Sequence, residues 1–340
     1  MKPASQPEFG DVTEELGRAW NRFWFTPADA FPSCVLRILV GLLTTAHFLL
    51  LGSDLNTWYA SDGALTPAAI QRILELPGAG GSAFHVTYLN GLPASTALYM
   101  VHALAVIVSL AFAFGLLTRL SGLLTLVALL AYVHRAPLVA GHVEPVLSFL
   151  LAYLCIAPSG AYLSVDQLVF GSRKKSPFLD IITGTSSQSL AANISTRLIQ
   201  VHLAMFYAMM GLSKLYGDAW WQGGALWILF AQTESRPLDG TVLRRAGQIG
   251  EYALNFLTHL IVYFELAFPI LIWTRIGRPI LLWVSMIAWL AIILATGHVL
   301  LGLTMLVAGL AFVPAERLRS LLGNTANESH GAGWTATSAV

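Results

Sequence analysis

The chain has 340 residues, of which 56% are apolar and only 11% are charged. A soluble domain of this length carries roughly a quarter charged residues, so the composition excludes an ordinary soluble protein and predicts an integral membrane protein. The formal net charge of +1 excludes a strongly basic nucleic-acid-binding surface. We therefore expect membrane lipid, and no nucleic acid, among its partners.

Eight apolar segments predict an all-α fold, a polytopic bundle of transmembrane helices. They cover residues 33–52, 96–115, 119–134, 145–163, 194–216, 251–273, 279–296 and 298–313. Gly297 and His298 leave almost no loop between the last two segments, so a count of seven spans is the main alternative. The first segment is too long for a signal-peptide core, and we expect it to remain as the first span.

The basic residues predict that both termini are cytoplasmic, because Lys and Arg gather in cytoplasmic loops. With the N-terminus inside, eleven basic residues fall inside: Lys2, Arg18, Arg22, Arg119, Arg173, Lys174, Lys175, Arg275, Arg278, Arg317 and Arg319. Five fall outside: Arg72, Arg135, Arg236, Arg244 and Arg245. The loops 53–95 and 217–250 then lie outside. Their aromatic residues suit a membrane interface or simply anchor helix ends: Trp58, Tyr59, Tyr88, Trp220 and Trp221.

Three segments are expected: a cytoplasmic N-terminal segment over 1–30, a transmembrane domain over 31–320 and a tail over 321–340. From residue 323 the tail is rich in Gly, Ala, Ser and Thr, which predicts disorder. Cys34 and Cys155 have no CxxC spacing, so they predict neither a redox motif nor a zinc site. Both fall inside apolar segments, and no disulfide is expected because helical faces would have to bring the two together. Nucleotide-binding, zinc-protease and serine-hydrolase motifs are missing, and we expect no metal.

The fifth segment carries a polar stripe. At about 100° per residue of helix, five of its residues fall within a sector of about 100°. They are Arg197, Gln200, Tyr207, Gly211 and Lys214. Such a stripe inside a bundle lines a cavity or contacts another polar helix. Gly211 would let a neighbour approach the backbone closely beside Lys214.

Lys214 has two interpretations. In the first, it lies near the outer helix end and its stem snorkels to the lipid headgroups. In the second, it faces a cavity, where burial disfavours the charged form. A lysine that is partly neutral can act as a general base.

Other ionisable residues within the segments need a partner or water. Glu265 can pair with Arg37 or Arg197, be protonated, or face water. His298 lies at a helix junction near the expected depth of Lys214. His259, His47 and His102 are expected to be packing or interfacial residues. The short outer loop can add polar groups to an outward cavity through His134, Arg135, His142 and Glu144.

Four stretches together resemble the horizontally transferred transmembrane domain (HTTM) family, which includes the vitamin K-dependent gamma-glutamyl carboxylases. They are "RLIQVHLAMFYAMMGLSKLYGDAWWQGGAL" (197–226), "WYASDGALTP" (58–67), "HRAPLVAGHVEPVLSFLLAYLCIAPSGAYLSVDQL" (134–168) and "YFELAFPILIW" (263–273). The resemblance covers about residues 20–320. It implies an HTTM-like transmembrane domain over 31–320.

The resemblance implies a catalytic role for Lys214. In the carboxylases, a lysine in a Gly-x-Lys-Lys-Leu segment deprotonates vitamin K hydroquinone, which then reacts with oxygen. The resulting strong base removes a proton from the gamma carbon of a glutamate, and carbon dioxide adds there. Here Lys214 matches the second lysine, and Ser213 replaces the first. His298 matches a family histidine, while Tyr207, Gly211, Arg197 and Glu265 are expected to support the cavity.

The expected cofactor is accordingly a reduced quinone, either vitamin K or menaquinone hydroquinone, and the substrate a peptide or protein. The expected location is a bacterial inner membrane. The human-type carboxylase has a large luminal domain for which this sequence shows no counterpart, so substrate recognition does not transfer. The alternatives are a non-catalytic membrane factor that binds or matures a secreted peptide or lipid, and a small quinone-linked redox subunit.

Overall fold

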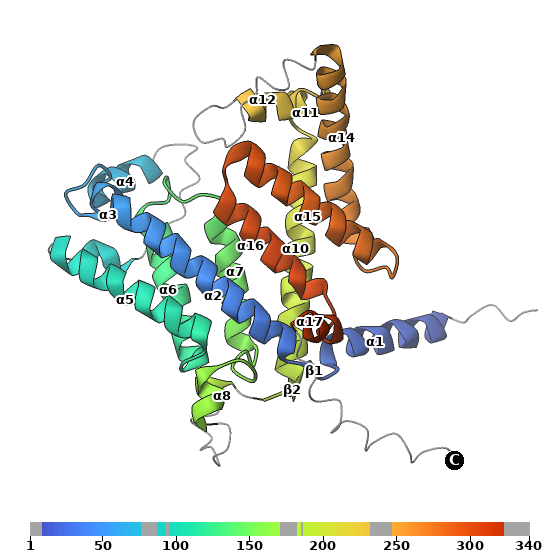
Figure 1. Ribbon diagram of the computed structural model, residues 1–340, viewed down its shortest axis with the longest axis horizontal. Helices are drawn as coiled ribbons and strands as arrows, with labels where there is room; N and C mark the ends of the chain where they lie inside the picture. The colour runs from blue at the N-terminus through green and yellow to red at the C-terminus, as the bar shows by residue number, and fades with distance from the viewer. Residues whose placement is uncertain are drawn as a thin grey trace, which may run out of the picture.

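The computed structural model describes residues 9–75, 87–92, 95–170, 182–184, 186–231 and 247–322, and it is almost entirely α-helical (Figure 1). The long helices are α1 (Phe9–Phe25), α2 (Phe31–Leu51), α5 (Ser95–Phe114), α6 (Thr118–Arg135), α7 (Val143–Ile156), α10 (Leu190–Lys214), α14 (Gly247–Leu271), α15 (Gly277–Thr296) and α16 (Val299–Gly309). The short helices are α3 (Leu55–Tyr59), α4 (Pro67–Leu74), α8 (Val165–Phe170), α11 (Asp218–Trp221), α12 (Ala225–Ala231) and α17 (Ala315–Leu321). The predicted all-α fold class is confirmed. The tail predicted to be disordered from residue 323 lies outside the described residues.

Four helices in the described part of the chain are long and apolar enough to cross a membrane. They are Phe31–Tyr59, Ser95–Phe114, Gly247–Leu271 and Gly277–Thr296. Val143–Ile156 and Val299–Phe312 are shorter apolar helices. Each of the eight predicted spans falls on a long helix, but their number as true spans stays a prediction.

Apolar side chains cover the outside of the bundle. Met100 on α5, Tyr252 on α14 and Ile287 on α15 are each more than 60% exposed within the chain itself. In water such large apolar patches would promote aggregation, whereas lipid accommodates them. Together with the four apolar helices, this surface identifies the chain as an integral membrane protein.

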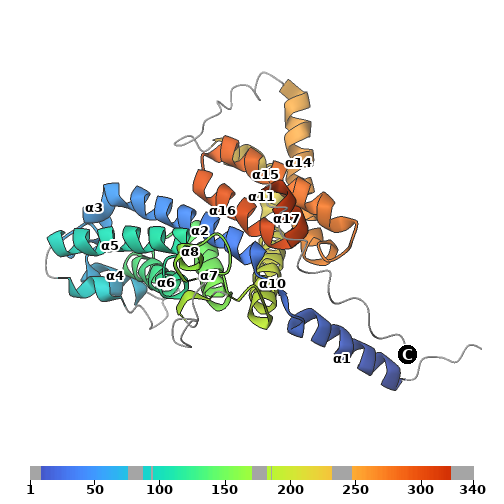
Figure 2. The ribbon, with the colours of Figure 1, turned by 60° about the horizontal axis from the view of Figure 1, so that its bottom comes forward.

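The long helices form two groups that share one hydrophobic core. Figure 1 shows α2, α5, α6 and α7 in one group and α10, α14, α15 and α16 in the other. Helix α10 packs on α7, and α16 packs on both α2 and α7. Phe48, Leu150, Leu203 and Phe268 belong to the same buried cluster, so packing joins the two groups. Figure 2 shows the two groups side by side.

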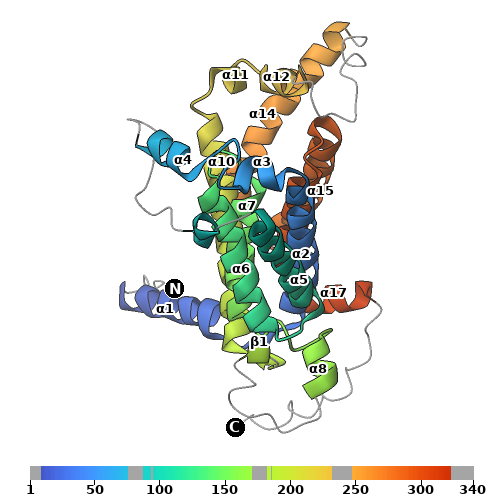
Figure 3. The same cartoon turned by 90° about the vertical axis from the view of Figure 1, so that its left-hand side faces the viewer.

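The connecting segments separate into two ends. Figure 3 shows α3, α4, α11 and α12 at one end, and α1, β1, α8 and α17 at the other. We call the first the loop end and the second the terminal end. The described parts of the two loops predicted to be outside therefore lie at the same end of the bundle, opposite α1 and α17. Which end faces the cytoplasm stays a prediction.

Two contacts at the terminal end were not predicted from the sequence. The strands β1 (Ala28–Asp29) and β2 (Gln188–Ser189) pair antiparallel, just before α2 and α10 begin. Arg319 of α17 makes an ion pair with Asp29 of β1. Two-residue strands carry no alternation pattern that a sequence reading can detect.

Two sequence-based predictions need correction. The fourth span was expected to reach residue 163, but α7 ends at Ile156 because Ala157, which precedes Pro158, is extended. Tyr59 was expected to suit the interface, but it is buried, with its ring centroid 4.9 Å from that of Tyr132.

Candidate functional site

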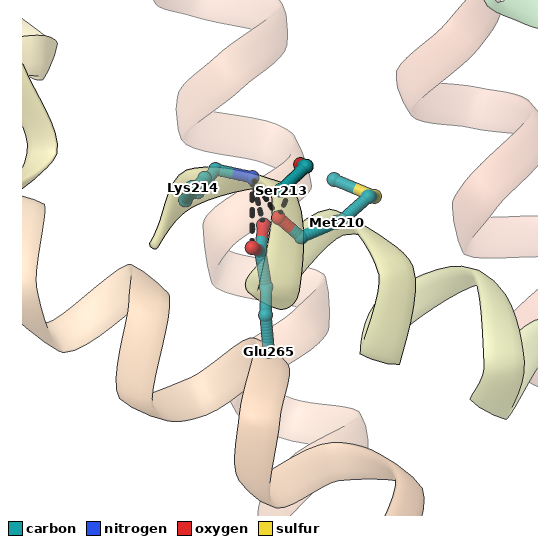
Figure 4. A network of polar contacts seen from close by, with 4 residues as sticks. All are labelled: Met210, Ser213, Lys214 and Glu265. Carbon is teal, nitrogen blue, oxygen red and sulfur yellow. Dashed lines mark hydrogen bonds and ion pairs between the residues drawn. The ribbon is translucent and has the colours of Figure 1, made fainter. Parts of the chain in front are cut away.

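Lys214 is the last residue of α10, and its side chain is turned toward α14. Its Nζ donates hydrogen bonds to both carboxylate oxygens of Glu265, at 2.8 Å to Oε1 and 2.7 Å to Oε2 (Figure 4). A longer contact of 3.4 Å joins Nζ to the carbonyl of Met210, one turn earlier. The side chains are only 14% and 5% exposed, so this is an ion pair largely removed from solvent.

Gly211 makes this pairing possible because it allows α10 and α14 to approach closely. A Cβ at position 211 would lie 2.9 Å from Leu266 Cδ2 and 3.2 Å from Glu265 Cβ. Both distances are tighter than ordinary van der Waals contact. A larger residue at position 211 would therefore push Glu265 away from Lys214.

An aromatic wall covers the pair on the loop end. Helix α11 places the Trp220 ring with its centroid 5.0 Å from Lys214 Nζ, which is within cation–π range. Trp221 donates from Nε1 to the carbonyl of Leu215, which ties α11 back to the end of α10. The charged amine therefore lies between a carboxylate and an indole face.

A small pocket opens beside the amine. It has a volume of about 60 Å³ and is lined by Lys214, Leu215, Trp220, Trp221, His259, Val262, Tyr263 and Leu266. Sites that enclose whole small-molecule ligands measure about 300–1,000 Å³. In this conformation the pocket accepts only the edge of a ligand. The rest of that ligand would lie along Tyr263 and Trp221, which are 70% and 64% exposed.

The structure matches neither simple interpretation of Lys214. The side chain does not extend away from the bundle toward headgroups, because Glu265 holds it on α14. It is also not a solitary buried amine, because its Nζ lies within hydrogen-bond distance of both carboxylate oxygens of Glu265. The expectation that burial alone makes the lysine neutral omitted this partner.

The other stripe residues also make inward contacts. The Tyr207 hydroxyl accepts a hydrogen bond from Trp289 Nε1 at 2.7 Å and lies 2.8 Å from Ser285 Oγ. Gln200 donates to the carbonyl of Ala311 at 2.7 Å. Arg197 donates to Gln200, so the stripe contacts α14, α15 and the segment after α16 along its length.

Three expected neighbours of the site are elsewhere. Pairing with Arg37 or Arg197 was one of the alternatives predicted for Glu265, but Arg37 donates to backbone carbonyls that follow α7, and Arg197 lies over the Phe23 ring. His298 is exposed at the start of α16. Within the described residues, no hydrogen bond, ion pair or pocket joins His298 to Lys214. His259, predicted to be a packing residue, lines the pocket instead.

A second group of polar side chains is buried near the loop end of α2, α5, α6 and α7. Glu144 accepts from the backbone of Gly141 and lies 3.8 Å from His47 Nε2. Arg135 is 1% exposed and donates to the carbonyl of Ala60 at 2.8 Å. The predicted polar groups therefore lie inside the bundle, where Arg135 links α6 to the end of α3 and Glu144 of α7 faces His47 of α2.

Cys34 and Cys155 are free thiols on α2 and α7. No group of three His, Cys, Asp or Glu residues that could hold a metal ion occurs in the described ranges. The cluster of Lys214, Glu265, Trp220 and His259 is thus the arrangement that best suits proton chemistry.

Trp220 and His259 were not predicted as site residues. Helical periodicity could not relate them to Lys214, because neither lies on α10. Trp220 is on α11, which begins after Gly217, and His259 is on α14. Comparison of the chain with family models, with curated proteins and with solved structures gives no match in any of the three. The HTTM resemblance therefore rests on the four sequence stretches alone.

Proposed function

We propose that the chain is a membrane protein of eight spans with both termini in the cytoplasm of a bacterium, and that the loop end carries quinol-dependent chemistry at the outer face. The reaction class is oxygen-dependent oxidation or carboxylation, as in the vitamin K-dependent carboxylases that the sequence resembles. The single observation that carries the proposal is the Lys214–Glu265 pair beside an aromatic pocket.

The residues fit the hydroxyl-bearing edge of a reduced quinone. Aromatic walls from Trp220 and Tyr263 suit a flat ring, and Lys214 supplies a nitrogen that can exchange a proton. The volume of about 60 Å³ does not enclose the ring. When bound, the quinol would supply the reducing electrons for reaction with oxygen.

Glu265 gives Lys214 a route to the neutral form. Transfer of one proton from Nζ to Oε2 across 2.7 Å converts the ion pair into an amine and a carboxylic acid. Burial in low-dielectric surroundings costs charged groups more free energy than neutral groups, which favours the neutral pair. The amine can then accept a proton from a hydroxyl group, while Glu265 holds the displaced proton.

Oxygen uptake tests the proposal directly. The purified full chain in lipid nanodiscs would be given reduced menaquinone or vitamin K, and oxygen consumption followed for wild type, Lys214→Gln and Glu265→Gln. We expect uptake above the protein-free rate in wild type and a loss of about 100-fold or more in Lys214→Gln. Ser213→Ala is the matched control, because Ser213 is exposed beside Lys214 and bonds only the carbonyl of Met210.

The result is decisive in both directions. Uptake that is equal in wild type and Lys214→Gln would refute the base role of this lysine. Uptake absent from wild type, with both quinols, would remove the catalytic proposal.

A non-catalytic membrane factor that binds or matures a secreted peptide or lipid is the second candidate. The observation that favours it is that Lys214 and Glu265 already satisfy each other without a ligand. A binding factor of this kind should keep its activity in peptide export or maturation when the pair is replaced by Met and Leu. An enzyme should not.

A further inference from the structure

A pocket at the terminal end combines three arginines with apolar walls. It lies between the α14–α15 connection and the α16–α17 connection and has a volume of about 310 Å³. Its lining comprises Trp273, Arg275, Arg278, Pro279, Leu282, Phe312, Val313, Pro314 and Arg317. This volume falls within the range of about 300–1,000 Å³ that is typical of ligand sites.

The positive charge of this pocket is not balanced by the part of the chain that the structure describes. Among the described residues, none of the ion pairs involves Arg275, Arg278 or Arg317. The described residues that line the pocket include no carboxylate. Arg278 also repels the guanidinium of Arg197, whose Nε is buried without a hydrogen-bond partner. An anion in the pocket would reduce the electrostatic repulsion among these arginine side chains.

The surroundings favour a lipid over a soluble anion. Trp273 forms one wall, and tryptophan is enriched at the boundary between hydrocarbon and headgroups. Leu282 and Phe312 form an apolar side, and Ile280 and Trp283 extend an exposed apolar face along α15. A headgroup in the pocket would thus leave its acyl chains against α15.

We propose that this pocket binds the phosphate of an anionic phospholipid in the leaflet on the side of α1 and α17. Guanidinium groups bind phosphate oxygens through paired, charge-assisted hydrogen bonds. Basic pockets between transmembrane helices on the cytoplasmic side are typical sites for anionic headgroups. The pocket is distinct from the Lys214 site, because none of its lining residues lines the pocket beside Lys214.

Lipid-dependent stability tests the site. The purified full chain would be delipidated in neutral detergent and titrated with phosphatidylglycerol, with phosphatidylcholine or with inorganic phosphate, and the thermal unfolding midpoint recorded. We expect phosphatidylglycerol to raise the midpoint and phosphatidylcholine to leave it nearly unchanged. In the double variant R278Q/R317Q, binding of phosphatidylglycerol should weaken at least about tenfold, because two charge-assisted contacts are lost.

Arg72→Gln is the matched control, because Arg72 is exposed on α4 at the loop end. It should retain the full shift. Arg317→Gln alone, on the exposed face of α17, provides a second variant if the double variant fails to fold. An equal phosphatidylglycerol shift in wild type and R317Q, or a shift produced by inorganic phosphate but not by phosphatidylglycerol, would overturn the proposal.

Discussion

Arg37 and Lys214 are both buried cations of the bundle, but they are held by different kinds of partner. Arg37 on α2 is fully buried and donates to the neutral carbonyls of Ser159 and Leu163, which lie in the segment after α7. Lys214 on α10 donates to both oxygens of a carboxylate. The first arrangement offers no acceptor for a proton, whereas the second one does.

The difference indicates that the two cations have different roles. Arginine stays charged under all ordinary conditions, and its planar fork can hold two carbonyls in fixed positions. It therefore acts as a clamp between α2 and the loop that follows α7. Lysine can lose its proton when its surroundings change, so among the two only Lys214 combines burial with the capacity for exchange.

The largest expected effect is that of Arg37→Met. The change removes a fully buried guanidinium that donates to the carbonyls of Ser159 and Leu163, and we expect the free energy of unfolding to fall by about 3–5 kcal/mol. Unfolding of the purified protein in mixed detergent micelles measures this. Arg18→Met is the control, since Arg18 is 66% exposed on α1. A loss below about 1 kcal/mol would contradict the clamp role.

A double-mutant cycle on the Lys214–Glu265 pair should give the next largest effect. Lys214→Met leaves the Glu265 charge buried, and we expect a loss of about 2–4 kcal/mol in the free energy of unfolding. Lys214→Met combined with Glu265→Leu should recover most of this loss, because well-packed apolar residues often replace a buried pair without cost. Additive losses in the double variant would show that the two side chains do not interact in the membrane.

The smallest expected effect is that of removing the Tyr207 hydroxyl, a neutral group on the same face of α10 as Lys214. Tyr207→Phe removes the hydroxyl that contacts Trp289 and Ser285, and we expect a loss of about 1–2 kcal/mol in the free energy of unfolding. Tyr216→Phe should change it by less than about 0.5 kcal/mol, because Tyr216 is 92% exposed. If Tyr207→Phe lowered the free energy of unfolding as much as Lys214→Met does, the ion pair would contribute no more to stability than a buried neutral hydrogen bond.

The positions of the eight apolar helices could be predicted from sequence because apolar segments of about 20 residues leave few alternatives in a membrane. Helix α1 (Phe9–Phe25) was missed, because residues 1–30 were expected only to be a cytoplasmic segment. The direction of the α10 stripe could also be predicted, since five polar positions repeat with the helical period. The end of α7 was missed because the apolar run continues past Ile156, and only the local geometry before Pro158 breaks it.

The partner of Glu265 could not be predicted from sequence. Periodicity gives the face on which a residue lies, but it does not say which helix packs against that face or at what height. Gly211 was a usable signal, since a glycine next to a polar face allows close helix packing. Gly211 indicates where a neighbouring helix can pack closely on α10, but it does not indicate that this neighbour is α14.

The strand pair and the Asp29–Arg319 contact at the terminal end have a consequence for biosynthesis. Strand β1 is made early, but β2 is separated from it by α2 through α8, and Arg319 comes near the end of the described chain. Contacts between distant segments form late because loop closure must precede them. The ion pair between β1 and α17 therefore forms only after translation of α17, so in a nascent chain stalled before that helix the segment around Asp29 should be cut by proteases more readily than in the full-length protein.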